Sequence, residues 1–174
     1  MSSCSVVIVA KNGGAVLFAT IETVIHQKQL TELIIVDNGN APAVISRLQQ
    51  IGLSEPRLKI IAGGTNLNYA QSCNIAARQA TSKYLVFLKS GYLLSPDALL
   101  ELTSVFSDEN KTMLSSGLVQ NYDGSLQVVP RSKIITPQSV LAEIIGTIPR
   151  NKKNADDVEK PSDTEKPYDV ATIA

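Results

Sequence analysis

The chain has 174 residues, which fits one domain and is long enough to bury a sizeable core. Its 16 basic and 16 acidic side chains balance, so no net field draws it to nucleic acid or to anionic lipid, and the absence of Trp disfavours a base-stacking surface. Its two cysteines have no partners at metal-ligand spacing, and no stretch resembles a secretory signal or a membrane span. We therefore expect a cytoplasmic protein with reduced thiols, without a nucleic-acid partner and without a transmembrane segment.

The first half of the chain alternates between two kinds of pattern. Residues 5–10 and 33–36 are β-branched, apolar runs without alternation, which is typical of strands buried on both faces. Helical periodicity follows each run, from Val16 after the first and over residues 41–51 after the second, where Gly52 is a stop signal.

The alternation continues through two more units. Residues 58–62 and 84–88 predict strands, and residues 68–80 predict a helix with a stripe of small residues, Ala70, Cys73, Ala77 and Ala80. Ser95 suits the N-cap of a fourth helix and Pro96 its first turn. Successive strand–helix units form parallel strands with right-handed crossovers, so the sequence predicts an α/β fold, a three-layer α/β/α sandwich with a mostly parallel sheet.

The pattern changes after the fourth helix. Residues 113–120 and 126–129 flank Asn121–Ser125, whose Asp-Gly dipeptide predicts a turn, so we expect a strand or hairpin there. Residues 137–145 fit a short helix. From Pro149 onwards charged residues and Pro dominate, which favours a folded domain over residues 1–148 and a charged, flexible tail or loop over residues 149–174.

Polar side chains follow the predicted strands at the edge where ligands bind in open parallel sheets. They are Lys11-Asn12, Asp37-Asn38, Asn66-Leu67-Asn68 and Lys89-Ser90. Asp37 ends a buried strand, where a carboxylate can accept hydrogen bonds from a ribose or from a base imide. The alternative for Asp37 is an Asx-turn residue that ends the strand.

The other candidates have structural alternatives as well. Asn12 precedes two glycines, so turn formation competes with a ligand role. Asn74 lies beside the apolar stripe of its helix and could instead bond a neighbouring loop. Lys89 could pair with a phosphate or be an exposed turn lysine. His26, the only histidine, favours a helix-terminal role because no nucleophile pairs with it.

Four segments in order carry a resemblance to a known family. They are Ser5-Val-Val-Ile-Val-Ala-Lys-Asn12, Glu32-Leu-Ile-Ile-Val-Asp37-Asn38-Gly39, Asn66-Leu-Asn-Tyr-Ala-Gln-Ser-Cys-Asn74 and Tyr84-Leu-Val-Phe-Leu88. Together with Asp123-Gly124 they resemble the nucleotide-sugar half of family-2 glycosyltransferases of the GT-A fold, near the rhamnosyltransferase-like branch. The likeness covers residues 5–146.

This resemblance implies a UDP- or dTDP-sugar donor and a role in polysaccharide or lipopolysaccharide assembly. It implies that Asp37 holds the base and that Asn12 and its neighbours, including Asn38, lie along the nucleoside. Asn66 and Asn74 would shape the loop and helix beneath the sugar phosphate. The acceptor half would follow residue 174, so we expect a fragment of a longer protein or a truncated product, with a homodimer or another partner supplying the acceptor site.

The departures from the family pattern bear on catalysis. The family has an aromatic or small residue at position 11 and Gly at position 68, whereas this chain has Lys11 and Asn68. Where the family carries an acidic motif for Mg²⁺ or Mn²⁺, this chain reads Lys89-Ser90-Gly91, and such cations prefer oxygen ligands. We therefore assign no catalytic and no metal-binding residue, and the sequence argues against hexosyl or rhamnosyl transfer by this chain alone.

Two further hypotheses remain open at this point. A catalytically degenerate GT-A module could serve as a binding or protein-interaction domain, which the Lys89-Ser90-Gly91 replacement motivates. An unrelated doubly wound nucleotide-binding protein would differ in the order of its strands.

Overall fold

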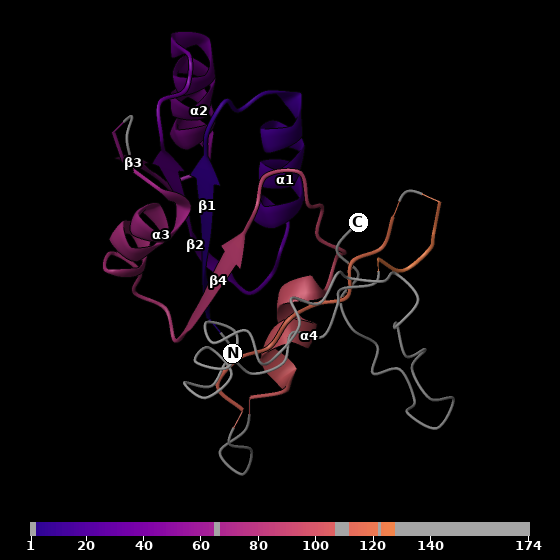
Figure 1. Ribbon diagram of the computed structural model, residues 1–174. Coiled ribbons are helices and arrows are strands. Elements are labelled where there is room, and N and C mark those ends of the chain that lie inside the picture. The colour runs from indigo at the N-terminus through magenta and orange to yellow at the C-terminus, as the bar shows by residue number, and fades with distance from the viewer. Residues whose placement is uncertain (1–2, 65–66, 107–111, 122, 128–174) are drawn as a thin grey trace, which may run out of the picture.

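A computed structural model describes residues 3–64, 67–106, 112–121 and 123–127. Strands and helices alternate along these residues (Figure 1). Their bounds are β1 Cys4–Ala10, α1 Ala15–Ile25, β2 Leu30–Asp37, α2 Pro42–Ser54, β3 Leu58–Ala62, α3 Tyr69–Ala77, β4 Tyr84–Leu88 and α4 Ala98–Ser104. The strands form one parallel sheet in the order β3-β2-β1-β4.

Helices cover both faces of this sheet, which confirms the predicted three-layer sandwich (Figure 1). On one face, Ile8 of β1 and Ile35 of β2 pack in a core with Leu17 of α1, Leu48 of α2 and Leu99 of α4. On the other face, the neighbouring residues of the same strands pack against α3. Because alternate side chains of a strand point to opposite faces, this burial explains why β1 and β2 are apolar at nearly every position.

Strand β4 has a different environment from the two central strands. It pairs with β1 on one side and has no strand on its other side among the described residues. Leu85 and Phe87 are exposed by 37% and 48% respectively. The register pairs Phe87 with Val7, which packs on the α3 side of the sheet, so these two side chains extend the face that α3 covers.

Three helices differ in detail from the sequence prediction. Helix α2 continues past Gly52 to Ser54, because Leu48 and the partly buried Ile51 still pack on the sheet there. Helix α4 begins at Ala98, with Asp97 at its N-cap, so the expected start at Ser95-Pro96 is wrong. Ser95 is instead held by the turn after α1, through a hydrogen bond from Gln27 Nε2 to its carbonyl oxygen (2.7 Å).

The small-residue stripe of α3 is also displaced from its expected position. The buried residues are Ser72, Cys73 and Ala76, whereas Ala70 is exposed. Cys4 and Cys73 are both buried and free, as expected. His26 is the C-cap of α1, where its Nδ1 lies 2.7 Å from the Glu22 carbonyl oxygen, which confirms the helix-terminal role.

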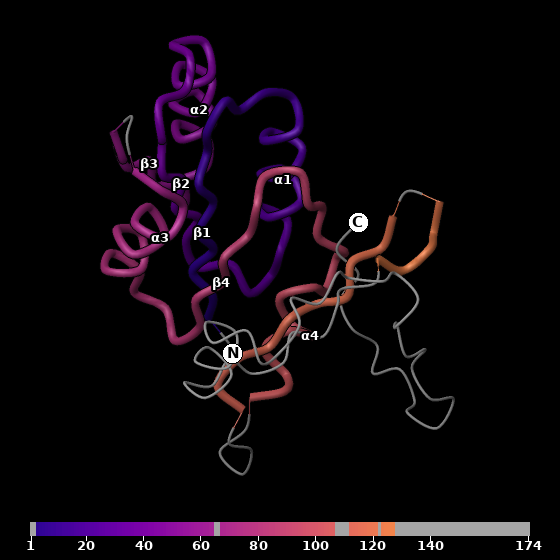
Figure 2. The backbone as a smooth tube through the Cα atoms, viewed as in Figure 1, coloured from indigo at the N-terminus to yellow at the C-terminus, as the bar shows by residue number. Residues whose placement is uncertain are grey.

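The turn after α4 is present as the Asp-Gly dipeptide predicts. Asn121 N donates to Ser125 O (2.8 Å), Gly124 adopts φ 82°, and Gln120 pairs with Leu126 in an antiparallel bridge (Figure 2). The short helix expected at residues 137–145 and the tail expected at residues 149–174 lie outside the described residues.

A buried carboxylate joins three strands at the amino end of the sheet. Glu32 of β2 is 3% exposed, and its Oε1 accepts hydrogen bonds from Ser5 Oγ (2.6 Å) and from Thr81 N and Oγ1 (2.6 and 2.9 Å). Its Oε2 accepts a hydrogen bond from Lys59 Nζ on β3 (2.5 Å). Burial alone would raise the pKa of Glu32, but these bonds outweigh it and lower the pKa to about 2.

Candidate functional site

The carboxyl ends of β1, β2 and β4 bring three charged residues to one edge of the sheet. Asp37, the last residue of β2, is in register with Ala10 at the end of β1. Leu88, which ends β4, is in register with Ile8 of β1, so Lys11 and Lys89 follow neighbouring strands at this edge. Parallel strands lie about 4.8 Å apart, so Asp37 and Lys89 are about 10 Å apart across β1.

Asn40 connects the two loops that leave β1 and β2. Its side chain is buried, with Nδ2 donating to Ala10 O (2.8 Å) and to Asp37 Oδ1 (2.5 Å). Its Oδ1 accepts a hydrogen bond from Gly13 N (2.6 Å). A Cβ on Gly13 would lie 3.1 Å from this Oδ1 and 2.6 Å from Leu17 Cδ2, so the absence of a side chain permits the close approach. Asn40 therefore fixes the β1–α1 loop relative to Asp37.

The carboxylate of Asp37 has two different oxygens. Oδ1 accepts hydrogen bonds from both the backbone N (2.9 Å) and the side-chain Nδ2 of Asn40, so the turn role of Asp37 is present. Oδ2 has no hydrogen-bond partner in the described part of the chain, and the residue is half-buried. The turn therefore orients the carboxylate and leaves one acceptor oxygen for a ligand, so the structural and functional interpretations of Asp37 are compatible.

Asn38 joins the β2 end to the loop before α3. Its backbone N donates to Ala10 O (2.9 Å) and its Nδ2 donates to Leu67 O (2.8 Å). Its Oδ1 is buried and accepts no hydrogen bond from the described residues. The same loop passes so close to β2 that a Cβ on Gly63 would lie 2.8 Å from Val36 Cγ1. A buried amide oxygen without a donor is uncommon, so a donor from a ligand or from water would satisfy it.

Asn12 adopts a left-handed backbone conformation, with φ 52°, and it is the only such non-glycine residue among the described positions. Asn tolerates this region better than other side chains, so the turn interpretation of Asn12 is confirmed. Its side chain is exposed at the carboxyl edge of β1.

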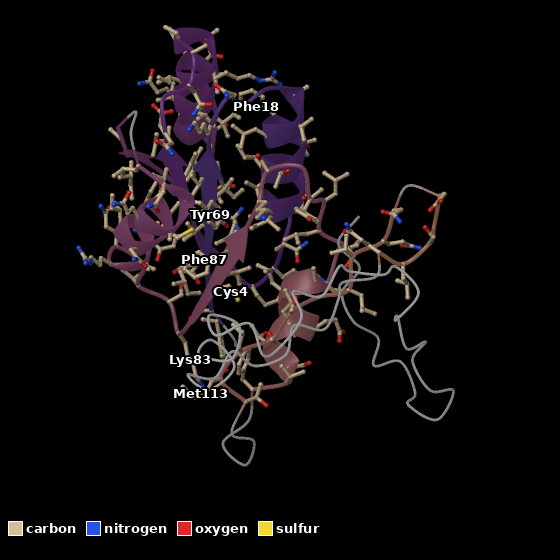
Figure 3. All side chains as sticks on the ribbon, viewed as in Figure 1. Cys4, Phe18, Tyr69, Lys83, Phe87 and Met113 are labelled. Atoms are coloured by element: carbon tan, nitrogen blue, oxygen red, sulfur yellow. The ribbon has the colours of Figure 1, made fainter. Side chains whose placement is uncertain are left out.

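Lys89 lies over an aromatic ring of the neighbouring helix. Its Nζ is 5.9 Å from the ring centroid of Tyr69, the first residue of α3. In Figure 3, Tyr69 lies nearer the carboxyl ends of the strands than Phe87, and Lys83 lies near the opposite end. Burial, followed by a hydrogen bond with the Cys73 thiol, raises the pKa of Tyr69 to about 12, so its hydroxyl stays neutral at physiological pH.

The segment after Ser90 leaves this edge along α1. Three backbone N–H groups of this segment donate hydrogen bonds to side-chain oxygens. Gly91 N donates to Thr20 Oγ1 (2.8 Å), Leu94 N to Thr23 Oγ1 (3.1 Å) and Leu99 N to Gln27 Oε1 (3.2 Å). Thr20 and Thr23 of α1 and Gln27, which follows the C-cap of α1, are spaced three or four residues apart and lead towards the amino end of the sheet. Asp97, the next carboxylate along the chain, therefore lies away from the carboxyl edge of the sheet, at the N-cap of α4.

The remaining predicted residues lie away from this cluster or outside the description. Asn74 is exposed in α3, and at 1.5 Å per residue it lies about 8 Å along the helix from Tyr69. Asn66 lies outside the described residues. Asn68, which replaces the glycine expected from the family pattern, caps α3, since its Oδ1 accepts from Gln71 N (2.9 Å) and Gln71 Oε1 accepts from Asn68 N (3.0 Å).

Comparison with known proteins identifies the family. Residues 5–164 match the family described as glycosyl transferase family 2. This chain belongs to glycosyl transferase family 2. An uncharacterized glycosyltransferase of Haemophilus influenzae is 25% identical over 121 residues, which are 67% of this chain and 37% of that protein. The family-2 chain thus spans little more than a third of the length of the curated relative that it matches.

Solved structures share the fold of this family-2 domain. The mannosyltransferase PcManGT from Pyrobaculum calidifontis, in complex with GDP-Man and Mn²⁺, aligns with a TM-score of 0.56 at 18% identity, over 67% of this chain and 34% of that one. S. aureus TarS 1–349 in complex with UDP-GlcNAc aligns with a TM-score of 0.51 at 15% identity, over 68% of this chain and 33% of that one. The parallel α/β arrangement is therefore that of GT-A glycosyltransferases, as the resemblance implied.

No helix in the described segments has the length and apolar character needed to cross a membrane. The described positions also contain no group of three or more His, Cys, Asp or Glu side chains that could hold a metal ion.

Sequence reasoning missed Asn40, which organises the site. Its signal was a third polar residue at the end of a buried strand, in Asp37-Asn38-Gly39-Asn40, but turn formation explains such a run equally well. Sequence reasoning also missed Thr20 and Thr23 of α1 and Gln27 just after it, whose side chains accept hydrogen bonds from the chain after β4 and direct it away from the site.

Proposed function

We propose that this family-2 domain binds a nucleoside-diphosphate sugar, a UDP- or dTDP-sugar, at the carboxyl edge of its sheet. The observation that carries the proposal is the Asp37 carboxylate, which has one oxygen oriented by Asn40 and one oxygen without a partner in the described region. The imide N–H of uracil or thymine is a single donor and matches this single acceptor.

The neighbouring groups support the same ligand class. Asn12 and the buried Asn38 Oδ1 lie on the loops that flank Asp37, where a nucleoside would extend. Lys89 follows β4, where a diphosphate would lie. Structural relatives were crystallised with UDP, UDP-GlcNAc and GDP-Man, which supports a nucleotide sugar as the ligand.

Where a longer protein or a partner supplies an acceptor site, the reaction is glycosyl transfer. An acceptor hydroxyl then attacks the anomeric carbon, and the nucleoside diphosphate leaves with the electrons of the broken glycosyl–oxygen bond. We propose polysaccharide or lipopolysaccharide assembly as the setting and a rhamnosyl-type donor as one candidate. The cytoplasmic location and the homodimer or partner remain proposals of the same kind.

Titration calorimetry with UDP, dTDP and GDP tests donor binding. Asp37→Asn keeps the size of the side chain and an oxygen for the Asn40 bonds but removes the charge, so it separates ligand binding from turn formation. A charge-assisted hydrogen bond contributes about 1.5–3 kcal/mol, so we expect UDP affinity to fall roughly 10- to 100-fold. Asp97→Asn, at the start of α4, is the matched control and should bind like the native chain. Equal affinities for both variants would refute the role of Asp37.

A second candidate function is a binding or protein-interaction module without transferase activity. The Lys89-Ser90-Gly91 sequence after β4 favours it, because no carboxylate follows the strand there. Transfer or hydrolysis of a sugar nucleotide by this chain, stimulated by metal, would exclude this second candidate.

A further inference from the structure

The described carboxyl edge of the sheet does not fit a divalent metal ion. Mg²⁺ and Mn²⁺ require several hard oxygen ligands, of which carboxylates are the most effective. Asp37 is the one carboxylate at the described strand ends, and its Oδ1 already accepts two hydrogen bonds from Asn40. The chain after β4 turns along α1 directly after Ser90, so it brings no acidic residue to this edge before Asp97.

Two lysines stand at this edge instead. Lys11 follows β1 and Lys89 follows β4, and these two strands are hydrogen-bonded neighbours. Both side chains are exposed, and neither forms an ion pair with a described residue, since the ion pairs there are Arg57–Glu55 and Lys59–Glu32. This edge therefore carries one negative group, Asp37 at the end of β2, and two positive groups. The positive groups follow β1 and β4, the next two strands of the sheet after β2.

The position of Lys89 is constrained by its contact with Tyr69. A cation 5.9 Å from a ring centroid is within the range of cation–π attraction, and it limits the directions that the flexible stem adopts. The ammonium group thus lies between the start of α3 and the end of β4, at the same edge as Asp37. A diphosphate that extends from a base at Asp37 across the edge of the sheet would lie over β1 and β4, which are about 5–10 Å from β2 at the strand spacing.

We propose that Lys11 and Lys89 bind the diphosphate of the nucleotide directly, so that this domain binds nucleoside diphosphates without a divalent cation. The inference rests on the proposed function, because it requires a nucleotide at Asp37. Two lysine ammonium groups neutralise the diphosphate as point charges and donate hydrogen bonds to its oxygens. The binding is therefore electrostatic, and it weakens as salt concentration rises.

The test compares ligands with and without phosphates. Calorimetry on the full chain measures uridine and UDP in EDTA, then UDP with Mn²⁺ in excess. We expect UDP to bind more tightly than uridine in EDTA and Mn²⁺ to change the UDP dissociation constant by less than about twofold. An exposed charge pair contributes up to about 1 kcal/mol, so Lys11→Gln and Lys89→Gln should each weaken UDP binding roughly two- to fivefold while leaving uridine binding unchanged.

Lys28→Gln is the matched control, because Lys28 is equally exposed but lies between α1 and β2, at the opposite end of the sheet. Tyr69→Leu removes the ring beneath Lys89 and should weaken UDP binding without affecting uridine. UDP binding that requires Mn²⁺, or that is unchanged in both lysine variants, would overturn the inference and leave the proposed function intact. Failure of uridine and UDP to bind under every condition would overturn both.

Discussion

The buried carboxylate of Glu32 makes a quantitative prediction about acid stability. The pKa of Glu32 is about 2 in the folded protein against an ordinary value of 4.5. A pKa difference of one unit corresponds to about 1.4 kcal/mol, so ionised Glu32 contributes about 3 kcal/mol to the free energy of unfolding at neutral pH. Glu32 is only 3% exposed, so solvent screens its charge little and reduces this contribution to stability only slightly. Its partner Lys59 is half-exposed, so solvent screens the lysine charge more strongly.

The direction of the pH dependence follows from the lowered pKa. The contribution of ionised Glu32 to the free energy of unfolding is fully present above the unfolded pKa of 4.5 and is lost as the pH falls towards 2. Between these pH values the carboxyl group is protonated in the unfolded chain but remains ionised in the folded protein. Glu32→Gln keeps an oxygen for Ser5 and Thr81 but has no charge for Lys59. Urea unfolding at pH 7 should therefore show a loss of about 2–3 kcal/mol in the variant.

The pH series provides the sharper criterion. With pKa values of about 2 and 4.5, the stability gap between native chain and Glu32→Gln should be about 1.4 kcal/mol smaller at pH 3.5 than at pH 7. Glu22→Gln, on the exposed face of α1, is the control and should match the native chain at each pH. A gap that stays constant with pH, or a Glu32→Gln variant as stable as the control, would refute the reasoning.

Three further substitutions test the loops at the site and the end of helix α2. Asn40→Ala removes three side-chain hydrogen bonds, so we expect a loss of about 2–4 kcal/mol in urea unfolding and roughly tenfold weaker UDP binding; native-like values for both would contradict its role. Gly63→Ala places a Cβ 2.8 Å from a β2 side chain, and a melting experiment should show a loss of about 1–3 kcal/mol. At Gly52 in α2 a Cβ would lie 4.0 Å from Leu58 Cδ2, an ordinary van der Waals contact, so Gly52→Ala should instead stabilise by about 0.5–1 kcal/mol, and a loss there would show that the glycine is needed.

Local pattern was sufficient for the strands and for the layer arrangement. The predicted runs Leu58–Ala62 and Tyr84–Leu88 coincide with β3 and β4, although these are the edge strands of the described sheet and keep exposed positions, so their mainly apolar composition was enough to locate them. The helix ends were less predictable. Gly52 resembles a stop signal, yet packing of Ile51 on the core outweighs the cost of a helical glycine.

The candidate site was predicted in part. Asp37, Asn38 and Lys89 meet at one edge because parallel strands present their carboxyl ends together, which topology alone implies. The ligand-binding roles of all six residues stay predictions, namely Asn12, Asp37, Asn38, Asn66, Asn74 and Lys89, and the tail predicted at residues 149–174 lies outside the described residues. The roles of Asn40 and Glu32 were not predicted, since all partners of Glu32, and the Gly13 and Ala10 partners of Asn40, are 27 or more residues away in the chain.

The sequence by itself determined the parallel α/β class, the edge of the sheet that carries polar residues, and the presence of Lys89-Ser90-Gly91, with no carboxylate, directly after the fourth strand. These features are local or follow from the order of the elements. Only the tertiary structure decided which oxygen of Asp37 is free, which ring lies beneath Lys89, and where the chain goes after β4. Those outcomes depend on contacts between residues distant in sequence, and periodicity carries no information about such contacts.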